Sequence, residues 1–487
     1  MTDPSLATDG EPLSARRVAH GRPRRAGGRP APTREDDGAT IARVLARPRF
    51  AFLVAGQTIS QLGDKLHHMA LIALVGAAAQ ANSGGLELAK LSVVFTAPVV
   101  LAGPLAGALV DRWNKRTTMI VADALRALLV VSIPALFRLT GSLYAVYAVA
   151  FCTFLLGVFF NAAKMALIPE LVPRAHLLPA NAALTFVGRF ATVIGIVGGG
   201  LIIGWPFWQR LGWSDYAAGF YLDAASYLVS VLTLAAIIAA GRPGEGRRVG
   251  RGMGEDGAAA PPPPPTPAPA VKRQLGTLVG DVTRTLGVVR RDRAMRFVFG
   301  SLVALSLFAS TVYVALTYSV QTVLGLGTRG VGYLGGILGT GMIVGSLLVG
   351  TIGTQWDKRE TILTGTASIG MLMIIGGVFF TWKVFLPVAF FGGMLLAPVM
   401  VSQDTLLHEE APPAARALIF STKDLILGAA FMLSALAVGG AIWLLGRLGI
   451  DQPYRVALAG VGLLILTAGV AGQLSRLADR RRAANRS

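Results

Sequence analysis

Four polar side chains that could bind protons or a substrate lie close together in the first long apolar segment of the chain. Asp64 lies at or beyond the middle of this segment, with Gln57 and Gln61 before it and His68 one helical turn after it, on about the same helix face. A carboxylate in a low-dielectric environment can exchange a proton near neutral pH. The pattern predicts a proton- or substrate-binding role for Asp64, and pairing with a cation or capping of a broken helix is the alternative.

Other charged residues lie within later apolar segments, where an unpaired charge is costly. Asp123 and Arg126 are three residues apart and can form a salt bridge on one helix face, either a permanent bridge or a gate that opens between conformations. Arg189 and the Lys423-Asp424 pair could bind an anionic substrate instead of holding a gate, and Asp223 could be a helix-start cap. The candidates for gates or charge pairs are Asp123, Arg126, Arg189, Asp223, Lys423 and Asp424.

The apolar segments that carry these residues define the fold class. The chain has 487 residues, of which 53% are hydrophobic and 15% are charged. Apolar runs of about 20 residues, the length that crosses a bilayer core as a helix, alternate with short basic segments. Backbone polar groups in lipid must be satisfied within each segment. The sequence therefore predicts an all-α polytopic membrane protein with twelve transmembrane helices.

Composition divides the chain into five parts. Residues 1–49 are a polar basic tail that we expect to be disordered, and residues 475–487 form a second basic tail. Residues 50–240 and 294–474 each carry six apolar segments. The intervening residues 241–293 contain a run of prolines typical of an extended spacer, and an amphipathic stretch that lies on the membrane surface or docks onto the bundle.

The distribution of Lys and Arg predicts the orientation. Most of them fall in segments that share one side of the membrane when both termini are cytoplasmic, as the positive-inside rule requires. We therefore expect a plasma-membrane protein with both termini in the cytoplasm. The excess of 45 basic over 26 acidic residues is explained in this way without a nucleic-acid partner.

Motifs for several other functions are missing from the sequence. The single cysteine, Cys152, excludes an intrachain disulfide and a cysteine-based metal site. There is no Gly-x-x-x-x-Gly-Lys-Ser/Thr loop for ATP, no metal-binding helix motif and no nucleophile elbow. We expect no cofactor, no metal and no enzyme activity.

A loop sequence occurs twice. Gly107–Ile120 and Gly350–Leu363 align without gaps and share glycine, tryptophan, Lys-Arg and threonine. A second pair, Pro169–Pro173 and His408–Pro412, agrees more weakly. The repeats indicate two pseudo-symmetric six-helix bundles, and transporters built in this way place their substrate site between the halves near the membrane midplane. The candidate loop residues are Gly107, Asp111, Arg112, Lys115, Arg116, Lys358 and Arg359.

The first copy of this loop resembles the signature between helices two and three of the major facilitator superfamily, with Asn114 at a usual glycine position. Four further stretches are similar to the exporter branch that includes the enterobactin exporter and macrolide efflux proteins. They are Gly56–Asp64, Asp123–Arg126, Pro169–Ala182 and Phe220–Ser226. The resemblance covers about residues 50–475 and implies that the loop controls opening of the inner face, a role we favour more for Asp111 and Arg116 than for Lys115.

The resemblance and the membrane carboxylates together predict a transporter working by alternating access. We expect proton-coupled efflux of a small hydrophobic or amphipathic compound, such as a drug, a siderophore or a metabolite, by a monomer in the lipid bilayer. An importer or a lipid flippase on the same fold is an alternative. A non-transporting membrane scaffold or receptor is another, although a scaffold has no use for charges inside the membrane.

Overall fold

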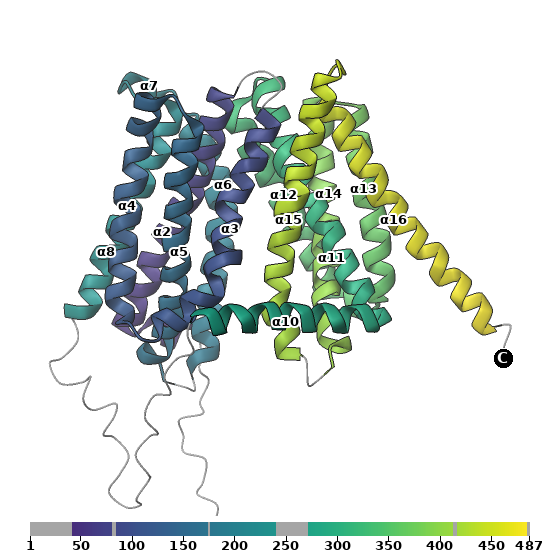
Figure 1. The fold of residues 1–487 in the computed structure, drawn as a ribbon, viewed down its shortest axis with the longest axis horizontal. Helices are drawn as coiled ribbons and strands as arrows, with labels where there is room; N and C mark the ends of the chain where they lie inside the picture. The colour runs from purple at the N-terminus through teal and green to yellow at the C-terminus, as the bar shows by residue number, and fades with distance from the viewer. Residues whose placement is uncertain (1–40, 80–83, 174–175, 240–270, 413–415, 485–487) are drawn as a thin grey trace, which may run out of the picture.

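The computed structural model describes residues 41–79, 84–173, 176–239, 271–412 and 416–484. These residues are almost entirely helical and form two bundles side by side (Figure 1). The first bundle contains α1 (Ile41–Leu45), α2 (Pro48–Ala78), α3 (Gly84–Val110), α4 (Lys115–Thr140), α5 (Leu143–Leu171), α6 (Leu177–Ile203), α7 (Phe207–Arg210) and α8 (Asp215–Ala239).

The second bundle repeats this pattern of six long helices. It contains α11 (Arg293–Thr311), continued by two π-helical segments, η3 (Val312–Leu316) and η4 (Ser319–Val323), and then α12 (Gly327–Ile352), the short η5 (Gly353–Gln355), α13 (Lys358–Val378), α14 (Trp382–Glu410), α15 (Arg416–Arg447) and α16 (Pro453–Ala484). The prediction of an all-α membrane protein in two six-helix halves is confirmed.

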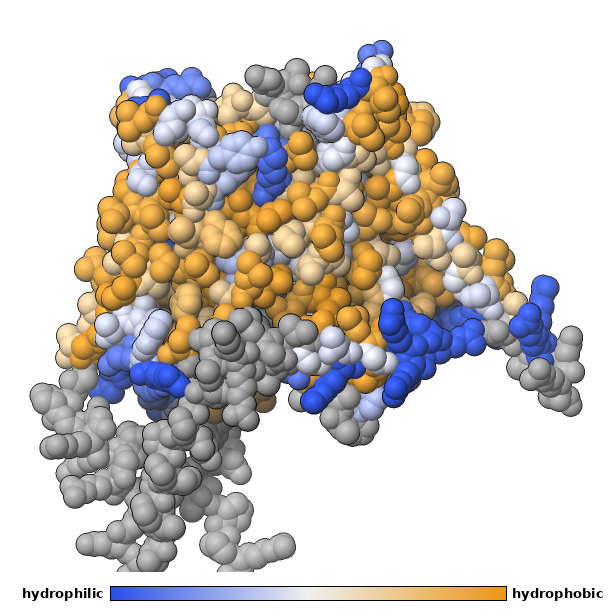
Figure 2. Space-filling model, in the orientation of Figure 1, coloured by the Kyte–Doolittle hydropathy of each residue, from blue (hydrophilic) through white to orange (hydrophobic). Residues whose placement is uncertain are grey.

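Eleven helices within the described ranges are long and apolar enough to cross a membrane. Figure 2 shows their apolar surface as a broad band, with hydrophilic residues gathered along its lower edge. The twelfth long helix, α2, has 31 residues but is less apolar than the others. The reason is that it carries the polar positions singled out from the sequence, which face protein rather than lipid.

The lower end in Figure 1, where α2 begins, α16 ends and α10 lies, is called the basic end here. The two repeated loops are found at this end, and each starts a helix by the same device. Asn114 accepts a hydrogen bond from the amide of Thr117, 3.2 Å away, and Asp357 accepts one from the amide of Glu360, 3.0 Å away. Such caps satisfy amides that lack a partner in the first turn of a helix.

Each repeated loop also forms an ion pair with the end of a neighbouring helix. Lys115 is 3.0 Å from Glu170 of α5, and Lys358 is 3.0 Å from Glu409 of α14. Arg359 adds a contact of 2.7 Å to Glu410. The two halves therefore share their loop contacts as well as their loop sequences, and in the first half the pair is made by Lys115, the position that we favoured less.

Helix α10 (Val271–Arg291) runs along the basic end beneath both bundles (Figure 1). It packs against α11 and α15 and also touches α3. Thr285 of α10 is buried, and its hydroxyl is 2.8 Å from that of Thr422 in α15. The docked interpretation of the amphipathic stretch therefore describes α10, and contact of this helix with a membrane surface stays a prediction.

The predicted tail boundaries are wrong by several residues. Ile41–Leu45 forms α1, and Val44 is fully buried in a cluster with Phe50 and Leu53. At the other end, α16 continues to Ala484, and its Arg476 reaches the Asp357 carboxylate. Burial of Val44 stabilises α1, and the contact of Arg476 with Asp357 stabilises the end of α16. Composition alone does not reveal either contact, so it predicts shorter helical regions. The Pro-rich run and residues 1–40 lie outside the described residues.

The two halves meet most closely at the end opposite to the basic end. There Gly200 of α6 lies against Gly332 and Thr328 of α12, because a Cβ added at Gly200 would be 2.7 Å from the Cα of Gly332 and from the carbonyl oxygen of Thr328. In the same way, Gly439 of α15 faces the backbone of α3 at Gly85. Small residues allow such backbone contact between membrane helices, so the structure is a state closed at this end.

Candidate functional site

Helix α2 positions the candidate site because two of its faces meet different surroundings. One face carries Gly56, Ser60, Gly63 and His67, spaced by three or four residues, and packs against α8. A Cβ at Gly63 would overlap the Ser226 hydroxyl, so the absence of a side chain is what allows this approach. The neighbouring face carries Lys65, His68, Met69 and Ile72 and lines a cavity. Asp64 lies between the two faces.

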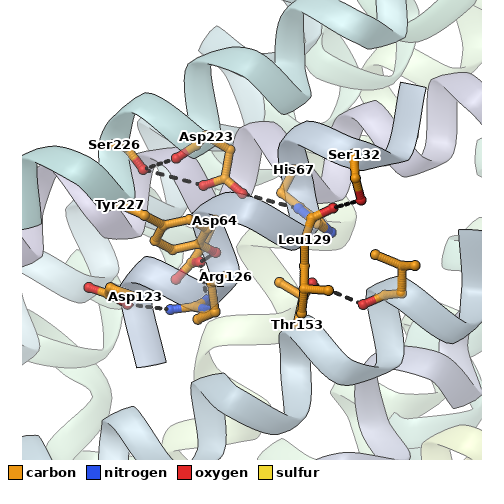
Figure 3. Close-up of polar contacts among 11 residues, drawn as sticks. Asp64, His67, Asp123, Arg126, Leu129, Ser132, Thr153, Asp223, Ser226 and Tyr227 are labelled. Atoms are coloured by element: carbon orange, nitrogen blue, oxygen red, sulfur yellow. Dashed lines mark hydrogen bonds and ion pairs between the residues drawn. The ribbon is translucent and has the colours of Figure 1, made fainter. Parts of the chain in front are cut away.

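A buried charge cluster surrounds Asp64 (Figure 3). One terminal nitrogen of Arg126 is 2.6 Å from Oδ1 of Asp64, and the other is 3.2 Å from Oδ1 of Asp123. The Tyr227 hydroxyl donates a hydrogen bond of 2.5 Å to Oδ1 of Asp64. The guanidinium also lies over the Tyr227 ring, 4.1 Å from its centroid. Three helices, α2, α4 and α8, are thus joined through one arginine.

The two carboxylates of this cluster differ in access. The Asp123 side chain is fully buried and Arg126 is 6% exposed, whereas the Asp64 side chain is 34% exposed. A planar guanidinium can hold two carboxylates at once, but a buried pair whose partner is lost leaves an uncompensated charge. Asp64 is therefore the more accessible of the two carboxylates that hold Arg126, and a change in its charge would redistribute the contacts of Arg126.

A second buried pair lies beside the cluster (Figure 3). Nδ1 of His67 is 3.0 Å from Oδ2 of Asp223, and both side chains are almost fully buried. The Ser226 hydroxyl lies 3.3 Å from the other carboxylate oxygen of Asp223. The predicted alternative that Asp223 is a helix-start cap is wrong, because α8 begins at Asp215, two turns earlier. The adjacent His67 and His68 face different ways, because His67 is buried against α8 and His68 contacts the rings of Phe95 and Tyr313.

A cavity of about 480 Å³ lies between the halves and extends into the second bundle. Its walls come from α2, α3 and α6 on one side and from every long helix of the second bundle, together with η3 and η4, on the other. The lining is mostly aliphatic and aromatic, and its polar side chains are Lys65, His68, Tyr313 and Thr317. A volume between about 300 and 1,000 Å³ with few polar groups is typical of small-molecule sites.

A second cavity, of about 460 Å³, lies nearer the basic end. It contains Lys423, whose ammonium is 2.8 Å from Asp404. The two cavities share Phe95, Ala309 and Phe431 as a common wall. The rings of Phe95 and Tyr313 are 5.5 Å apart and those of Phe95 and Phe431 are 6.1 Å apart. This aromatic wall separates the central cavity from the basic end.

The remaining candidates are dispersed. Gln57 is buried in α2, and Gln61 faces α6 at Gly188. Arg189 and Asp424 are exposed on the surface of the bundles. Asp64 was predicted in the proton or substrate group, and the structure brings it together with Asp123 and Arg126 of the predicted gate group. Of the other gate candidates, Asp223 lies beside this cluster, whereas Arg189 and Asp424 lie apart from it.

Four contributors were not among the predicted site residues. Lys65 and His67 flank the predicted positions on α2, Tyr227 covers Arg126, and Tyr313 lies in the second bundle. The available signal was helical spacing, since Lys65 is three residues before His68 and His67 is four after Gly63. Nothing in the local sequence marks Tyr227 or Tyr313, which reach the site only through packing.

Two repeated six-helix halves with a cavity between them, and charges buried next to it, define a membrane carrier fold. The family model of the Major Facilitator Superfamily matches residues 53–422. The chain belongs to this superfamily.

Curated relatives match part of the chain. One is named uncharacterized MFS-type transporter YfiS of Bacillus subtilis (strain 168), 32% identical over 37% of this chain and 40% of that protein. Another is named uncharacterized MFS-type transporter Rv0037c of Mycobacterium tuberculosis (strain ATCC 25618 / H37Rv), 25% identical over 31% of this chain and 34% of that protein. The matched region spans less than half the length of either relative.

Solved structures of low sequence identity share the fold. A peptide transporter, POT, in complex with alafosfalin has a TM-score of 0.61 at 13% identity and covers 88% of this chain and 94% of that one. A bacterial homologue of the human lysosomal transporter Spinster, inward-facing and occupied, has a TM-score of 0.61 at 11% identity over 88% and 96%. The nucleoside transporter NupG gives 0.59 at 12% identity over 86% and 99%.

Proposed function

We propose that this protein is a secondary active transporter that exports a small hydrophobic or amphipathic compound in exchange for protons. The exporter branch that its motifs resemble supports this direction. In this proposal the chain is a monomeric carrier of the plasma membrane, not an enzyme, and has no nucleic-acid partner. The basic end, with both termini, faces the cytoplasm, because basic loops are retained on that side.

The observation that carries the proposal is the position of the Asp64 cluster directly beside the cavity on one helix. Asp64 joins α2 to α4 and α8 through Arg126 and Tyr227, and the next residue, Lys65, lines the cavity. A proton on Asp64 removes one of the two charges that hold Arg126, so that α2 can move relative to α4 and α8. The substrate contacts of α2 would change with that movement, which is the coupling that an antiporter requires.

Alternating access is supported by the contacts between the halves. The glycine contacts of α6 with α12 and of α3 with α15 close the end opposite to the basic end. Rocking of the halves about the central cavity would open this end and close the other. The predicted loop latch would act at the basic end, where Lys115 and Lys358 pair with Glu170 and Glu409.

Transport into inverted membrane vesicles tests the proposal. A panel of fluorescent hydrophobic compounds is offered with and without an imposed proton gradient, for wild type, Asp64→Asn and the control Asp451→Asn. Asp451 is exposed in the loop before α16, far from the cluster in sequence and outside the cavity lining. We expect gradient-driven accumulation in wild type and in the control, and its loss in Asp64→Asn at equal expression.

Two other outcomes would redirect the assignment. Gradient-driven uptake that persists in Asp64→Asn would remove Asp64 from coupling and move the test to Asp123 and Asp223. Redistribution of labelled lipid between leaflets without dependence on the gradient would favour a flippase over an antiporter.

A further inference from the structure

The charge on the wall of the central cavity is one-sided. Among the lining residues that the structure describes, Lys65 is the only lysine or arginine, and none is an aspartate or a glutamate. The remaining polar positions, His68, Tyr313 and Thr317, can donate hydrogen bonds to an anion. A cation in an otherwise apolar cavity is costly unless an anion accompanies it.

The stem of Lys65 packs against α6, and the residue belongs to the cavity lining. A Cβ added at Gly195 of α6 would be 2.6 Å from Cβ and 2.7 Å from Cγ of Lys65, so the stem of the lysine lies on this glycine. The ion pairs found in the described part of the chain do not include Lys65. Its neighbour Asp64 points to Arg126 and Tyr227. Lys65 thus lies in the cavity wall and makes no ion pair within the described ranges, although its charge acts on the Asp64 carboxylate beside it.

A hydroxyl group without a hydrogen-bond partner in the described ranges belongs to a residue at the same end of the cavity. The Tyr313 hydroxyl is inaccessible to solvent and has no hydrogen-bond partner in the described ranges. The Tyr313 ring is 5.8 Å from the ring of His68, which follows Lys65 by one helical turn. Tyr313 belongs to the π-helical segment η3, and such widened turns recur at functional sites.

The rest of the cavity is apolar and deep. Helices α12, α13 and α14 supply Leu338, Met373, Phe385 and Leu396 to its wall. Gly392 also lines it, and a Cβ added there would meet no atom within 4 Å, so free volume lies next to this residue. One end therefore offers a cation and hydrogen-bond donors, and the other offers a surface that excludes water.

We propose that this cavity binds an amphipathic anion, with its carboxylate, phosphate or sulfonate group at Lys65, His68 and Tyr313 and its apolar body between α12, α13 and α14. This inference deepens the proposed function by assigning the substrate class of the same site, and its transport role rests on that function. Binding itself requires neither a proton gradient nor export. A single-chain amphiphile and an anionic bilayer lipid both have this combination of an anionic group and an apolar body.

Photolabelling of the full chain in nanodiscs of neutral lipid tests the inference at equilibrium. The probes are a long-chain fatty acid with a diazirine near the end of its chain, the matched fatty alcohol, and a diazirine-bearing phosphatidylglycerol. Labelled residues are located by mass spectrometry. The fatty acid is expected to label the walls contributed by α12, α13 and α14, about tenfold more than the alcohol does, because a hydrogen bond to a charged group contributes at least that factor.

Variants separate charge from shape. Lys65→Met should reduce labelling of the cavity by the acid about tenfold, the factor that a charged contact contributes. Lys65→Arg should retain labelling, and Gly392→Leu should block it by filling the cavity. The control Lys383→Met changes an exposed lysine at the start of α14, outside the cavity lining, and should behave as wild type. Cavity labelling by phosphatidylglycerol that also depends on Lys65 would identify a bilayer lipid as a source of the anion.

The inference is overturned if acid and alcohol label the cavity equally in wild type, a comparison that needs no variant to fold. It is also overturned if Lys65→Met labels as strongly as Lys65→Arg, or if every probe labels only the outer surface. Failure of gradient-driven export with acid labelling intact would leave this inference standing and reject the proposed coupling.

Discussion

At the scale of single residues, Arg126 carries more interactions than any other side chain described at the site. It contacts Asp64, Asp123 and the Tyr227 ring at once. Arginine suits this position because its planar guanidinium offers several donors in fixed directions, whereas a lysine offers a single point charge. The stability of the first bundle and the charge state of Asp64 therefore depend on the same residue.

Removal of this arginine should destabilise the protein strongly. Arg126→Leu leaves two carboxylates without their cation, and breaking a buried pair in this way costs about 3–5 kcal/mol. The double variant Asp123→Asn with Arg126→Leu should recover part of the loss, because the fully buried charge is then neutral. Thermal unfolding of detergent-solubilised protein measures both, with Arg284→Leu on the exposed side of α10 as a control. Equal stability of Arg126→Leu and wild type would contradict the structure.

Asp357 links the repeated loop to the C-terminal helix and provides a pH-dependent contact outside the membrane. The Arg476 hydrogen bond lowers the pKa of Asp357 from 3.8 to about 2, burial opposes this shift, and the backbone amide of Glu360 assists it. Because the pKa is lower in the folded state, the ionised carboxylate favours folding. That contribution is complete above about pH 4 and is lost as the pH falls from about 4 to about 2.

The variant Asp357→Asn should keep the helix cap and lose the charge contact. At neutral pH the loss should be below about 1 kcal/mol, because the side chain is 42% exposed and such pairs are weakened by solvent. Between pH 4 and pH 2 the unfolding temperature of wild type should fall further than that of the variant. Parallel curves for the two proteins over this range would show that the Arg476 contact has no effect on stability.

At the scale of secondary-structure elements, the small residues of α2 decide where the polar residues go. Gly56 and Gly63 lie one heptad apart and meet Thr233 and Ser226 of α8. This close approach brings His67 to Asp223 and Asp64 to Tyr227. On the adjacent face of α2, Lys65 and His68 do not pack against α8 and instead line the cavity.

A methyl group at Gly63 should disturb this contact. The Cβ of Gly63→Ala would overlap the Ser226 hydroxyl and lie 2.6 Å from Oδ1 of Asp223, so we expect a loss of about 1–3 kcal/mol from overpacking. Gly300→Ala in α11 meets no atom within 4 Å and should be neutral or stabilising by up to about 1 kcal/mol. The unfolding temperatures of the two variants should differ in this order, and Ser226→Ala should partly rescue Gly63→Ala. No difference between them would exclude close packing of α2 on α8.

At the scale of the whole molecule, the two halves are held together by backbone contacts at one end. Gly200 of α6 and Gly332 of α12 approach too closely for a side chain on either residue. A methyl group at Gly200 would therefore destabilise the state that is closed at this end, but not a state in which this end is open. Such a difference shifts the population of the two states.

Gly200→Ala should therefore favour the state that is closed at the basic end. Spin labels at Leu178 on α6 and Ile352 on α12, both exposed near the basic end, report the change after Cys152→Ser removes the native thiol. We expect a shorter distance between the labels in a larger fraction of Gly200→Ala molecules. Gly198→Ala, on the same helix, meets no atom within 4 Å and should match the unsubstituted protein. Identical distance distributions for both variants would contradict this mechanism.

The sequence by itself determined what depends on neighbours along the chain. Apolar runs of bilayer length determined the membrane fold, and the repeated loops determined the two halves, since both are local patterns. Asp123 and Arg126 could be paired because three residues along a helix bring two side chains to one face. The loop sequence likewise placed Lys115 and Lys358 at equivalent positions.

Only the tertiary structure decided how the polar groups of different helices combine. Asp64 contacts Arg126 across 62 positions of the chain and Tyr227 across 163. Such pairs depend on how α2, α4 and α8 are rotated and how closely they approach one another. Small residues at the helix contacts determine this approach, and the spacing of residues along one helix does not. The same packing turned His67 inward and left Lys65 in the wall of a cavity whose other side comes from the second bundle. A local pattern does not specify these partners, because each depends on contacts that form only after the helices have assembled.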